Sequence, residues 1–580
     1  MANRFFALVH ATANARAEVA TRIQGRSDLA VALDRPECVV IHEATACAIP
    51  VLDRGTILGP LFMTGRRQRQ TALAPEDAIL VHNTVGEFLP RAFWGGYVAL
   101  LVGETSVAVL RAPFGELPCL AVRTPTATLL ASDVAMLTTL GNISPRVDRD
   151  ATARFLAAPD TRSGETCLAG VEELRGGERL ILRPGGATTE NMWSPWDHAA
   201  GARRILDPVE ATARLRDTIL SSVATRCSEA GRIAVMLSGG LDSSVLAAAA
   251  TAGGLEVIGV NVTTSDAAGD ERRYARMTAA ETGLALVERS LDVHDVDLAR
   301  SSAATLPRPS TRAFWSSARH QARRVAAENH APFVATGGGG DNIFCSLQSV
   351  SPLLDCRLDI EGRTEFWRVA RTIAELTGSD MLTVLRRAWL RSWQPHRQVT
   401  DEIDPSFLSA IALTAVHAAS RHPWRRRPRH IPPGKGAHVA LLVGTQGLAE
   451  DGDPLAETPI LYPLLSQPIV ETCLRIPSWR WFDRGCNRAA ARHAFSPLLP
   501  AEVAWRRSKG SPDGFVVQLY ETNRRLIRAM LLDGKLAGFG LLDVDAIARA
   551  LDGLGPASGT DHGRIMRLVD VETWSRCWPG

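Results

Sequence analysis

The clearest hydrophobic pattern in the chain is a series of short apolar runs, separated by longer amphipathic segments, between residues 233 and 336. The apolar runs predict buried strands over residues 233–237, 257–262, 284–289 and 332–336. The segments between them predict a helix from Val245 onward and helices over residues 270–282 and 315–329. Strands that alternate with helices are typical of a doubly wound parallel α/β sheet, whose ligands bind at the carboxyl ends of the strands.

The segments on either side of this pattern are less regular. Before it, apolar runs over residues 95–100, 107–111 and 129–133, interrupted by turns, predict an all-β or α+β module. After it, residues 345–457 predict a helical insert rich in Trp and Arg, for example at 366–368, 386–393 and 422–428. Two interpretations of the insert stay open. It is either an ordinary helical surface with solvated arginines, or a groove in which aromatic rings and arginines bind an extended peptide.

The composition is that of an ordinary globular protein. The 580 residues are 46% hydrophobic and 22% charged with a net charge of +3, so two or three domains fit and nothing global indicates nucleic-acid binding. The ten cysteines are scattered without metal-binding spacing, and we expect them to be reduced. No apolar run approaches the roughly 20 residues of a membrane span, and the apolar start is too short for a signal peptide. We therefore expect a cytoplasmic protein with no membrane span.

The strongest chemical signal follows the first predicted strand, in the run Ser238-Gly239-Gly240-Leu241-Asp242-Ser243-Ser244. The paired glycines allow the backbone to approach an anion, and a helix that begins here points N–H groups at the same place. The three serines add hydroxyl donors. A carboxylate would be repelled by a phosphate unless a cation lay between them, so Asp242 is predicted to bind Mg²⁺. A plain Ser/Asp helix cap is the alternative.

A second glycine-rich turn, Thr336-Gly337-Gly338-Gly339-Gly340-Asp341-Asn342, follows the fourth predicted strand. Four successive glycines lose much backbone entropy on folding, so we expect the close approach of a ligand here rather than a flexible loop. Asp270 and Glu271 open the helix after the second strand. They fit an acid pair favoured by the helix dipole, and a carboxylate that faces substrate or metal is the alternative.

The first loop resembles the pyrophosphate-binding loop of the ATP pyrophosphatase superfamily, whose members cleave ATP between the α- and β-phosphates. The resemblance implies adenylation with ATP and Mg²⁺. The second turn resembles the Ser-Gly-Glu-Gly-Ala-Asp-Glu segment of asparagine synthetases, with Gly338 and Asn342 in place of two acidic residues. By this resemblance Asp341 is a catalytic residue and a second Mg²⁺ ligand. The residues implied to bind the nucleotide are Leu237, Ser238, Gly239, Gly240, Leu241, Asp242, Ser243, Ser244, Val260, Thr336 and Gly337.

The C-terminal region continues this resemblance. An apolar segment over residues 458–465 and two predicted helices lead to Trp505-Arg506-Arg507-Ser508-Lys509-Gly510-Ser511, which resembles the Arg-x-Lys-Gly loop over the active site of the synthetases. Lys509 is predicted to be catalytic, because its ammonium would neutralise charge at the α-phosphate and the acyl oxygen. A solvated surface lysine is the alternative, but a tight turn favours an aimed side chain.

Residues 1–200 resemble the αββα glutamine amidohydrolase domain of asparagine synthetases, and residues 205–580 resemble their synthetase domain, with the helical insert at about 345–457. Glutamine hydrolysis in that family requires an N-terminal cysteine whose own amine is the base. Here position 2 is Ala2, the first cysteine is Cys38, and Arg111-Ala112-Pro113 lacks the family's aspartate. We therefore expect a degenerate domain with a structural or docking role.

Three groups of relatives keep the synthetase core without glutaminase activity: β-lactam synthetases, carbapenam synthetases and lasso peptide cyclases. The β-lactam group uses a Tyr/Glu pair after the second glycine turn, but no tyrosine lies between Phe344 and Leu461. Pro423-Trp424, Pro432-Pro433-Gly434-Lys435 and His438 resemble lasso peptide cyclases.

The predicted function is macrolactam formation in a precursor peptide, by adenylation of an Asp or Glu side chain and attack of the N-terminal amine. A leader-binding protein and a leader peptidase are the further partners that the resemblance implies. The alternatives are an amide-forming synthetase for a small amino acid and a degenerate synthetase that serves as a scaffold.

Overall fold

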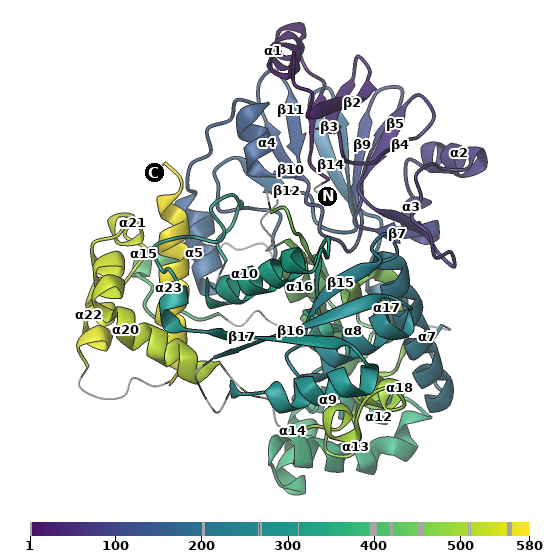
Figure 1. Cartoon of the computed structure of the whole chain (residues 1–580), viewed down its shortest axis with the longest axis vertical. Helices are drawn as coiled ribbons and strands as arrows, with labels where there is room; N and C mark the ends of the chain where they lie inside the picture. The colour runs from purple at the N-terminus through teal and green to yellow at the C-terminus, as the bar shows by residue number, and fades with distance from the viewer. Residues whose placement is uncertain are drawn as a thin grey trace.

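A computed structural model describes residues 3–199, 203–264, 266, 269–310, 313–394, 403–417, 422–450, 456–507, 510, 512–553 and 559–579. It is a mixed α/β chain with an N-terminal domain of two stacked sheets and a second half built on a parallel sheet (Figure 1). This confirms the predicted mixed α/β fold, with an N-terminal sheet module and a parallel sheet. Among the helices of the described parts, none is long and apolar enough to cross a membrane.

The N-terminal domain contains two antiparallel six-stranded sheets. The first sheet runs in the order β12 (Val171–Glu173), β10 (Leu120–Arg123), β11 (Thr128–Ala131), β1 (Phe5–Val9), β3 (Cys38–Glu43) and β2 (Leu29–Asp34). The second runs in the order β14 (Gly186–Asn191), β13 (Glu178–Arg183), β9 (Val107–Arg111), β8 (Val98–Val102), β5 (Gly55–Leu58) and β4 (Ala48–Pro50). A short ribbon of β6 (Leu61–Met63) and β7 (Phe93–Gly95) lies beside them.

The alternation of side chains along the strands explains why the two sheets stack. In β1, Phe5 packs into the core shared with the second sheet, whereas its neighbour Phe6 packs on the opposite side. Helices cover the outer faces, with α1 (Ala13–Ile23) and α4 (Val134–Thr139) on the first sheet and α2 (Pro75–Asn83) and α3 (Leu89–Ala92) on the second (Figure 1). Helices α5 (Arg149–Ala157) and α6 (Trp196–Ala199) lead to the second half.

The second half has a parallel sheet in the order β17 (Ala285–Leu291), β16 (Glu256–Thr264), β15 (Arg232–Met236), β18 (Val334–Thr336) and β19 (Ile460–Leu461). Helix α7 (Pro208–Arg226) precedes the sheet, and α8 (Leu241–Ala252), α9 (Arg272–Thr282) and α10 (Ala313–Glu328) connect its strands. Because the chain order reverses between β15 and β18, α10 lies on the opposite face from α8 and α9 (Figure 1). The ends of β15 and β18 therefore form the switch point where such folds bind ligands.

Three details of the predicted pattern are corrected. The helix expected from Val245 begins at Leu241, so Asp242, Ser243 and Ser244 belong to its first turn. The strand expected from residue 332 begins at Val334, after a proline that has no N–H to donate. The apolar run at 458–465 contributes a fifth parallel strand, β19, which the sequence pattern did not indicate.

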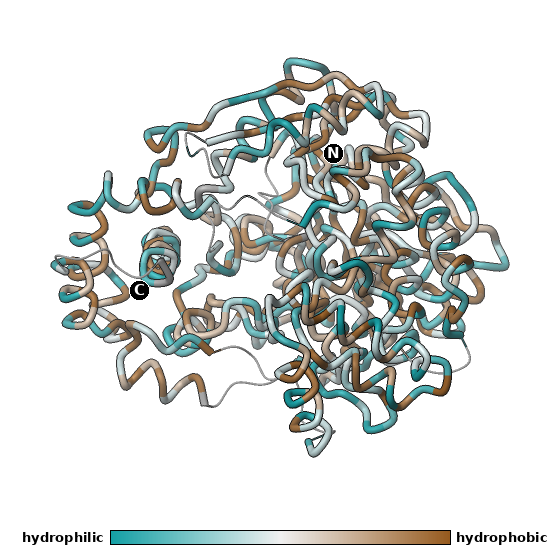
Figure 2. The backbone as a smooth tube through the Cα atoms, turned by 90° about the horizontal axis from the view of Figure 1, so that it is seen from below, coloured by the Kyte–Doolittle hydropathy of each residue, from teal (hydrophilic) through white to brown (hydrophobic). Residues whose placement is uncertain are grey.

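The insert is helical, as predicted. It follows the short helix α11 (Gly340–Ile343) and contains α12 (Ser351–Leu358), α13 (Gly362–Thr377), α14 (Met381–Ser392), α15 (Ala410–His417), a 3₁₀ turn over Pro423–Arg425 and α16 (Pro433–Glu450). The C-terminal helices are α17 (Gln467–Arg475), α18 (Ala489–Phe495), α19 (Ala501–Ala504), α20 (Asp513–Leu532), α21 (Lys535–Gly538), α22 (Val544–Asp552) and α23 (Gly559–Arg576). Apolar residues of α5, α15, α20, α22 and α23 form a separate helical core, in the lobe that holds the C-terminus (Figure 2).

Candidate functional site

The first glycine-rich loop joins β15 to α8 and is shaped by its contacts with α9. Gly239 has a left-handed backbone (φ +79°), and a Cβ there would lie 2.8 Å from the Glu271 carbonyl oxygen and 2.9 Å from Tyr274 Cβ. The Ser238 N–H donates to Ser243 Oγ at 3.2 Å, and the Gly240 N–H donates to Ser238 Oγ at 3.3 Å. These bonds fold the loop over the N-terminus of α8, where an anion is favoured.

The structure brings most of the predicted nucleotide-binding residues to one cavity of about 1160 Å³. The predicted residues that line it are Ser238, Gly240, Leu241, Asp242, Ser243, Thr336, Gly337 and Asp341. Leu237, Gly239, Ser244 and Val260 are not in its lining.

Two of the residues outside the lining support the loop from beneath. The Leu237 carbonyl accepts a hydrogen bond of 2.7 Å from Asn261 Nδ2, and the Ser244 hydroxyl lies 3.1 Å from that of Thr278 in α9. Ser244 is fully buried, because it belongs to the inward face of the first turn of α8. Its hydroxyl is therefore directed to α9 and not to the cavity.

The second glycine-rich turn packs against the first loop. A Cβ at Gly337 would lie 2.6 Å from the Ser243 backbone nitrogen, and a Cβ at Gly340 would lie 2.5 Å from Asp242 Cγ. A Cβ at Gly338 would lie 2.8 Å from the ring of Tyr462. These glycines allow the two loops and Tyr462 to approach one another, and Gly337, Gly338 and Gly339 also line the cavity. The close approach of a ligand to this turn stays a prediction.

Asp242 and Asp341 converge on one cation. The guanidinium of Arg488 donates from Nη1 to both carboxylate oxygens of Asp242 at 3.2 Å and also to Asp341 Oδ1. Arg488 precedes α18 and has a left-handed backbone conformation (φ +58°). Sequence reasoning missed this residue, and the only local signal is an arginine after Gly485-Cys486-Asn487.

The two carboxylates suit a magnesium ion. Mg²⁺ prefers oxygen ligands and is commonly held by one or two carboxylates, with phosphate oxygens and water as the remaining ligands. Both carboxylates already reach a single positive charge, so they are close enough to share a small cation. In the described part of the chain, no group of three or more His, Cys, Asp or Glu side chains is arranged to hold a metal on its own. The phosphates would thus have to complete the coordination.

The acid pair at the start of α9 divides into two roles. Asp270 accepts hydrogen bonds from the Arg272 guanidinium, which lowers the pKa of that carboxyl to about 2. Glu271 instead forms an ion pair of 2.8 Å with Arg506 and accepts the Gly510 N–H at 2.8 Å. Asp270 forms a local ion pair with Arg272 at the start of α9. Glu271 connects the first loop to the loop that contains Arg506 and Gly510, called here the C-terminal loop.

Arg506 also connects the C-terminal loop to the first loop and to α9. Its guanidinium lies 3.7 Å from the ring centroid of Tyr274 and donates weakly to the Gly239 carbonyl at 3.4 Å. Lys509, the predicted catalytic lysine, lies outside the described residues. Gly510, the next residue along the chain, is anchored on Glu271, whose own backbone adjoins Gly239.

The far wall of the cavity comes from the insert and the C-terminal lobe. It includes Arg425 and residues 403–406 of the insert, and Asp561, Arg564 and Arg567 of α23. Trp315 and Arg319 of α10 and Tyr462, which follows β19, line the cavity as well. Tyr462 accepts a hydrogen bond of 3.4 Å from Arg319 Nη2. Tyr462 directly follows Leu461, the end of the interval in which the sequence contains no tyrosine.

The aromatic residues of the insert do not build this wall. Trp367, Trp389 and Trp393 are 65%, 57% and 71% exposed on α13 and at the end of α14, and none of them lines the cavity. Trp424 is buried between Phe114 and Trp193. The Trp/Arg-rich stretches contribute only Arg425 to this cavity. The interpretation of the insert as a peptide groove lined by its aromatic rings is therefore wrong for this cavity.

Helix α16 supports the second turn. His438 is fully buried and its Nε2 donates to the Ile343 carbonyl at 2.8 Å, while Asn342 Nδ2 donates to the Leu441 carbonyl at 2.7 Å. Lys435 is fully enclosed, and burial lowers its pKa to about 8. Gly434 and Lys435 donate backbone N–H bonds of 2.7 and 2.9 Å to Asp355. His438, Gly434 and Lys435 therefore support the turn that carries Asp341 from outside the cavity, whereas Asn342 and Leu441 line it.

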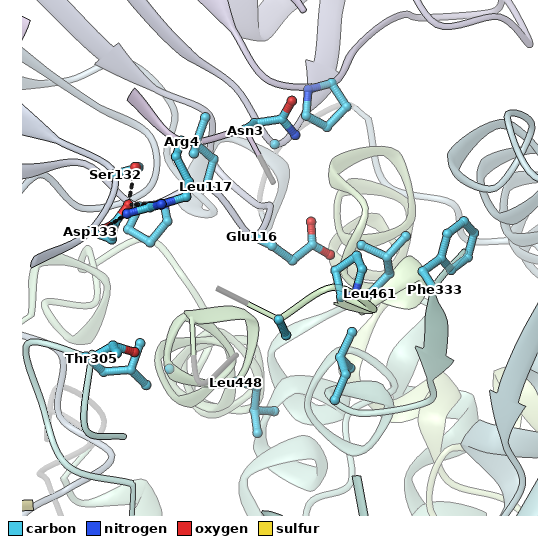
Figure 3. Close-up of a pocket in the computed structure, with 18 of the residues that line it drawn as sticks. Asn3, Arg4, Glu116, Leu117, Ser132, Asp133, Thr305, Phe333, Leu448 and Leu461 are labelled. Atoms are coloured by element: carbon cyan, nitrogen blue, oxygen red, sulfur yellow. Dashed lines mark hydrogen bonds and ion pairs between the residues drawn. The ribbon is translucent and has the colours of Figure 1, made fainter. Parts of the chain in front are cut away.

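A second cavity of about 460 Å³ lies between the N-terminal domain and the parallel sheet (Figure 3). Glu116 projects into it between Leu117 and Leu461, and on another side Arg4 binds Asp133 (Figure 3). Pro159, Asp160, Gly444 and Leu448 line both cavities, so the two spaces are adjacent.

The N-terminal domain offers no exposed thiol at Cys38. This residue is fully buried in the core between the sheets, and burial raises the pKa of its thiol to about 12. Arg111 is also buried and forms an ion pair of 2.8 Å with Glu173. Both residues are structural, and Ala2 lies outside the described residues.

Comparisons with known proteins identify the second half of the chain. The sequence model of the asparagine synthase family matches residues 214–434 and 458–576. No curated protein matches the chain. An allosteric regulatory enzyme of purine biosynthesis matches at 11% identity with a TM-score of 0.20, over 50% of this chain and 80% of its own. Glutamine phosphoribosylpyrophosphate amidotransferase from B. subtilis matches at 12% identity with a TM-score of 0.21, over 49% of this chain and 65% of its own.

Proposed function

The chain belongs to the asparagine synthase family of ATP-dependent amide-forming ligases, and from this premise we propose that it closes a macrolactam ring in a lasso peptide precursor. The first step would join a side-chain carboxylate of an Asp or Glu to the α-phosphorus of ATP, with release of pyrophosphate. The second would join the N-terminal amine of the same peptide to the activated carbonyl carbon, with release of AMP and a proton.

One observation carries the nucleotide part of the proposal. The first loop, both carboxylates and Arg506 border a single cavity at the switch point of the parallel sheet. Asp242 and Asp341 would hold Mg²⁺, which supplies positive charge between protein carboxylates and phosphates. Ser238 and Gly240 would bind the departing pyrophosphate at the N-terminus of α8. Lys509 remains the proposed catalytic lysine.

The size of the cavity supports a large second substrate. Small-molecule sites are commonly about 300–1,000 Å³, and this cavity is about 1160 Å³. Its far wall carries Arg425, Arg564 and Arg567 together with Asp404 and Asp561, a mixture suited to the charged termini and side chains of a peptide. Holding both ends of one peptide in such a space would provide much of the rate enhancement through proximity.

A small amino acid as the substrate is the second candidate, because Tyr462 lines the cavity and is hydrogen-bonded to Arg319. A tyrosine beside an arginine is suited to accept a proton from an amine, as the β-lactam alternative requires. A scaffold without catalysis is the third reading. The precursor peptide, a leader-binding protein and a leader peptidase are the proposed partners.

The test is a reaction of the purified chain with ATP, Mg²⁺ and a leaderless core peptide. The proposal predicts a peptide product lighter by one water, formed together with AMP and pyrophosphate. A peptide with an acetylated N-terminus and one with Asn or Gln at the ring-closing position are the matched controls, and neither should lose water. Turnover of free amino acids without peptide would contradict the peptide proposal and favour the second candidate, and no turnover of either would favour the scaffold.

A further inference from the structure

Arg488 is bound differently from the other arginines around the first loop. The guanidinium of Arg492 donates to the backbone carbonyls of Asn487, Ala504 and Arg506, which fixes it within the C-terminal loop. Arg506 is fixed by Glu271 and the Tyr274 ring. Arg488, by contrast, bonds only to Asp242 and Asp341 within the described residues. Its contacts are with the same two side chains that are suited to Mg²⁺.

The backbone holds Arg488 in this position from the start of α18. Its left-handed conformation is uncommon for a residue with a long side chain, and such strain clusters at functional sites. The side chain is only 13% exposed, and Nε is buried without a hydrogen-bond partner in the described parts. Asp242 is 14% exposed, so this ion pair is poorly screened by water.

We propose that Arg488 is an internal cation that occupies the place of Mg²⁺ between Asp242 and Asp341 until a nucleotide arrives. Nη1 of Arg488 lies within hydrogen-bond distance of three carboxylate oxygens of Asp242 and Asp341, so a metal ion that bridged these side chains would meet its positive charge and have to displace it. The two cations therefore compete for the space between the carboxylates. ATP resolves this competition, since its phosphates offer the guanidinium new partners beside Ser238 and release both carboxylates for the metal. The nucleotide part of this inference rests on the proposed function, and the competition between cations does not.

The competition predicts a coupling between metal and nucleotide. In the unmodified chain the metal alone binds weakly and the nucleotide strengthens its binding, and by linkage the metal strengthens nucleotide binding by the same factor. Replacing Arg488 by methionine keeps the length of the side chain and removes its charge. The two carboxylates then repel each other and attract a free cation. Nucleotide-free metal binding should tighten by about tenfold or more, the factor expected for the loss of a charged hydrogen bond.

The experiment measures Mn²⁺ binding by electron paramagnetic resonance, with the full chain and without nucleotide, in the unmodified protein and in Arg488→Met. Arg484→Met is the control, because Arg484 is 65% exposed on the same segment and does not touch Asp242 or Asp341. We expect tighter Mn²⁺ binding only in Arg488→Met, and we expect Asp242→Asn in the same background to abolish the gain. Equal Mn²⁺ affinity in Arg488→Met and the unmodified protein would overturn the inference.

A second measurement adds a nucleotide analogue with a methylene group between the α- and β-phosphorus atoms. The unmodified chain should bind Mn²⁺ at least about tenfold more tightly with the analogue present, and Arg488→Met should lose most of that coupling. If Arg488→Met unfolds, Arg488→Gln replaces it, and Mn²⁺ alone should raise the Tm of that variant but not of the unmodified protein. Inactivity toward every substrate would contradict the proposed function and leave the metal competition measurable.

Discussion

Replacing Gly340 by alanine should displace Asp242, although alanine itself tolerates the backbone conformation of residue 340. Gly340 is the first residue of α11, and its φ lies outside the left-handed region. The new Cβ would lie 2.5 Å from Cγ, 2.6 Å from Cβ and 2.8 Å from Oδ1 of Asp242. Carbon atoms in contact are about 3.5–4.0 Å apart, so the carboxylate must move by about 1 Å.

The expected magnitude follows from this displacement. Overpacking of this kind costs about 1–3 kcal/mol in the free energy of unfolding, which would lower the Tm by several degrees. A misplacement of about 1 Å at a reacting centre reduces rates by about 100-fold. Gly340→Ala should therefore fold and lose about 100-fold or more in AMP formation, measured by separating AMP from ATP chromatographically.

Gly444→Ala is the matched control. Gly444 lines the same cavity from α16, and a Cβ there would have its nearest neighbour, Asn342 Nδ2, at 3.8 Å. An added methyl group in a helix interior is stabilising by about 0.5–1 kcal/mol. Gly444→Ala should keep its activity and show a slightly raised Tm. If Gly340→Ala forms AMP as fast as Gly444→Ala, the placement of Asp242 does not control the chemistry and the reasoning is refuted.

Three further variants test separate parts of the structure. Burial lowers the pKa of His422 to about 3, so the unfolded chain binds a proton below about pH 6.5 that the folded chain does not, and stability falls as the pH drops from 6.5 toward 3. His422→Gln should therefore shrink the difference in Tm between pH 7 and pH 5, and an unchanged difference would contradict this. Glu271→Gln removes the charge that pairs with Arg506 and keeps an oxygen for the Gly510 N–H, so tryptic cleavage after Arg506 should speed up several-fold through the loss of the ion pair. A cleavage rate equal to that of the unmodified chain would show that the ion pair does not hold this loop in place. Ser238→Ala should weaken binding of the methylene nucleotide analogue by about fivefold, the value of one hydrogen bond, whereas Ser244→Ala should lower only the Tm. Calorimetric titration of both variants separates the two roles, and weaker binding in Ser244→Ala but not in Ser238→Ala would contradict them.

Local sequence patterns predicted the strand, glycine turn and helix around residues 233–252, because buried strands and helix starts leave their signals within a few residues. The candidate role of Asp242 follows from the same reasoning, since it lies in a glycine-rich turn after a buried strand, whereas that of Asp341 rests on the resemblance of its turn to a segment of asparagine synthetases. The helix boundary was misplaced by one turn, which is why the inward orientation of Ser244 escaped prediction.

Contacts between distant segments could not be predicted in this way. Arg488 and Asp242 are separated by 246 positions, and Arg506 reaches Gly239 across 267. These two contacts depend on how α18 and the C-terminal loop pack on the sheet, and the periodicity of a local segment does not predict that packing. Trp424 and Trp393 illustrate the same limit, because similar Trp/Arg-rich stretches place one ring in the core and leave the other exposed.

The central claim is that a carboxylate of the substrate is activated as an adenylate, and an oxygen label tests it most directly. A core peptide carrying ¹⁸O in its ring-closing Asp or Glu carboxylate would be incubated with the chain, ATP and Mg²⁺, and the released nucleotide analysed by mass spectrometry. The account predicts AMP that carries one ¹⁸O atom for each dehydrated peptide, since the bond to the α-phosphorus is made by that carboxylate oxygen. Unlabelled AMP, or ADP with labelled phosphate, would contradict it.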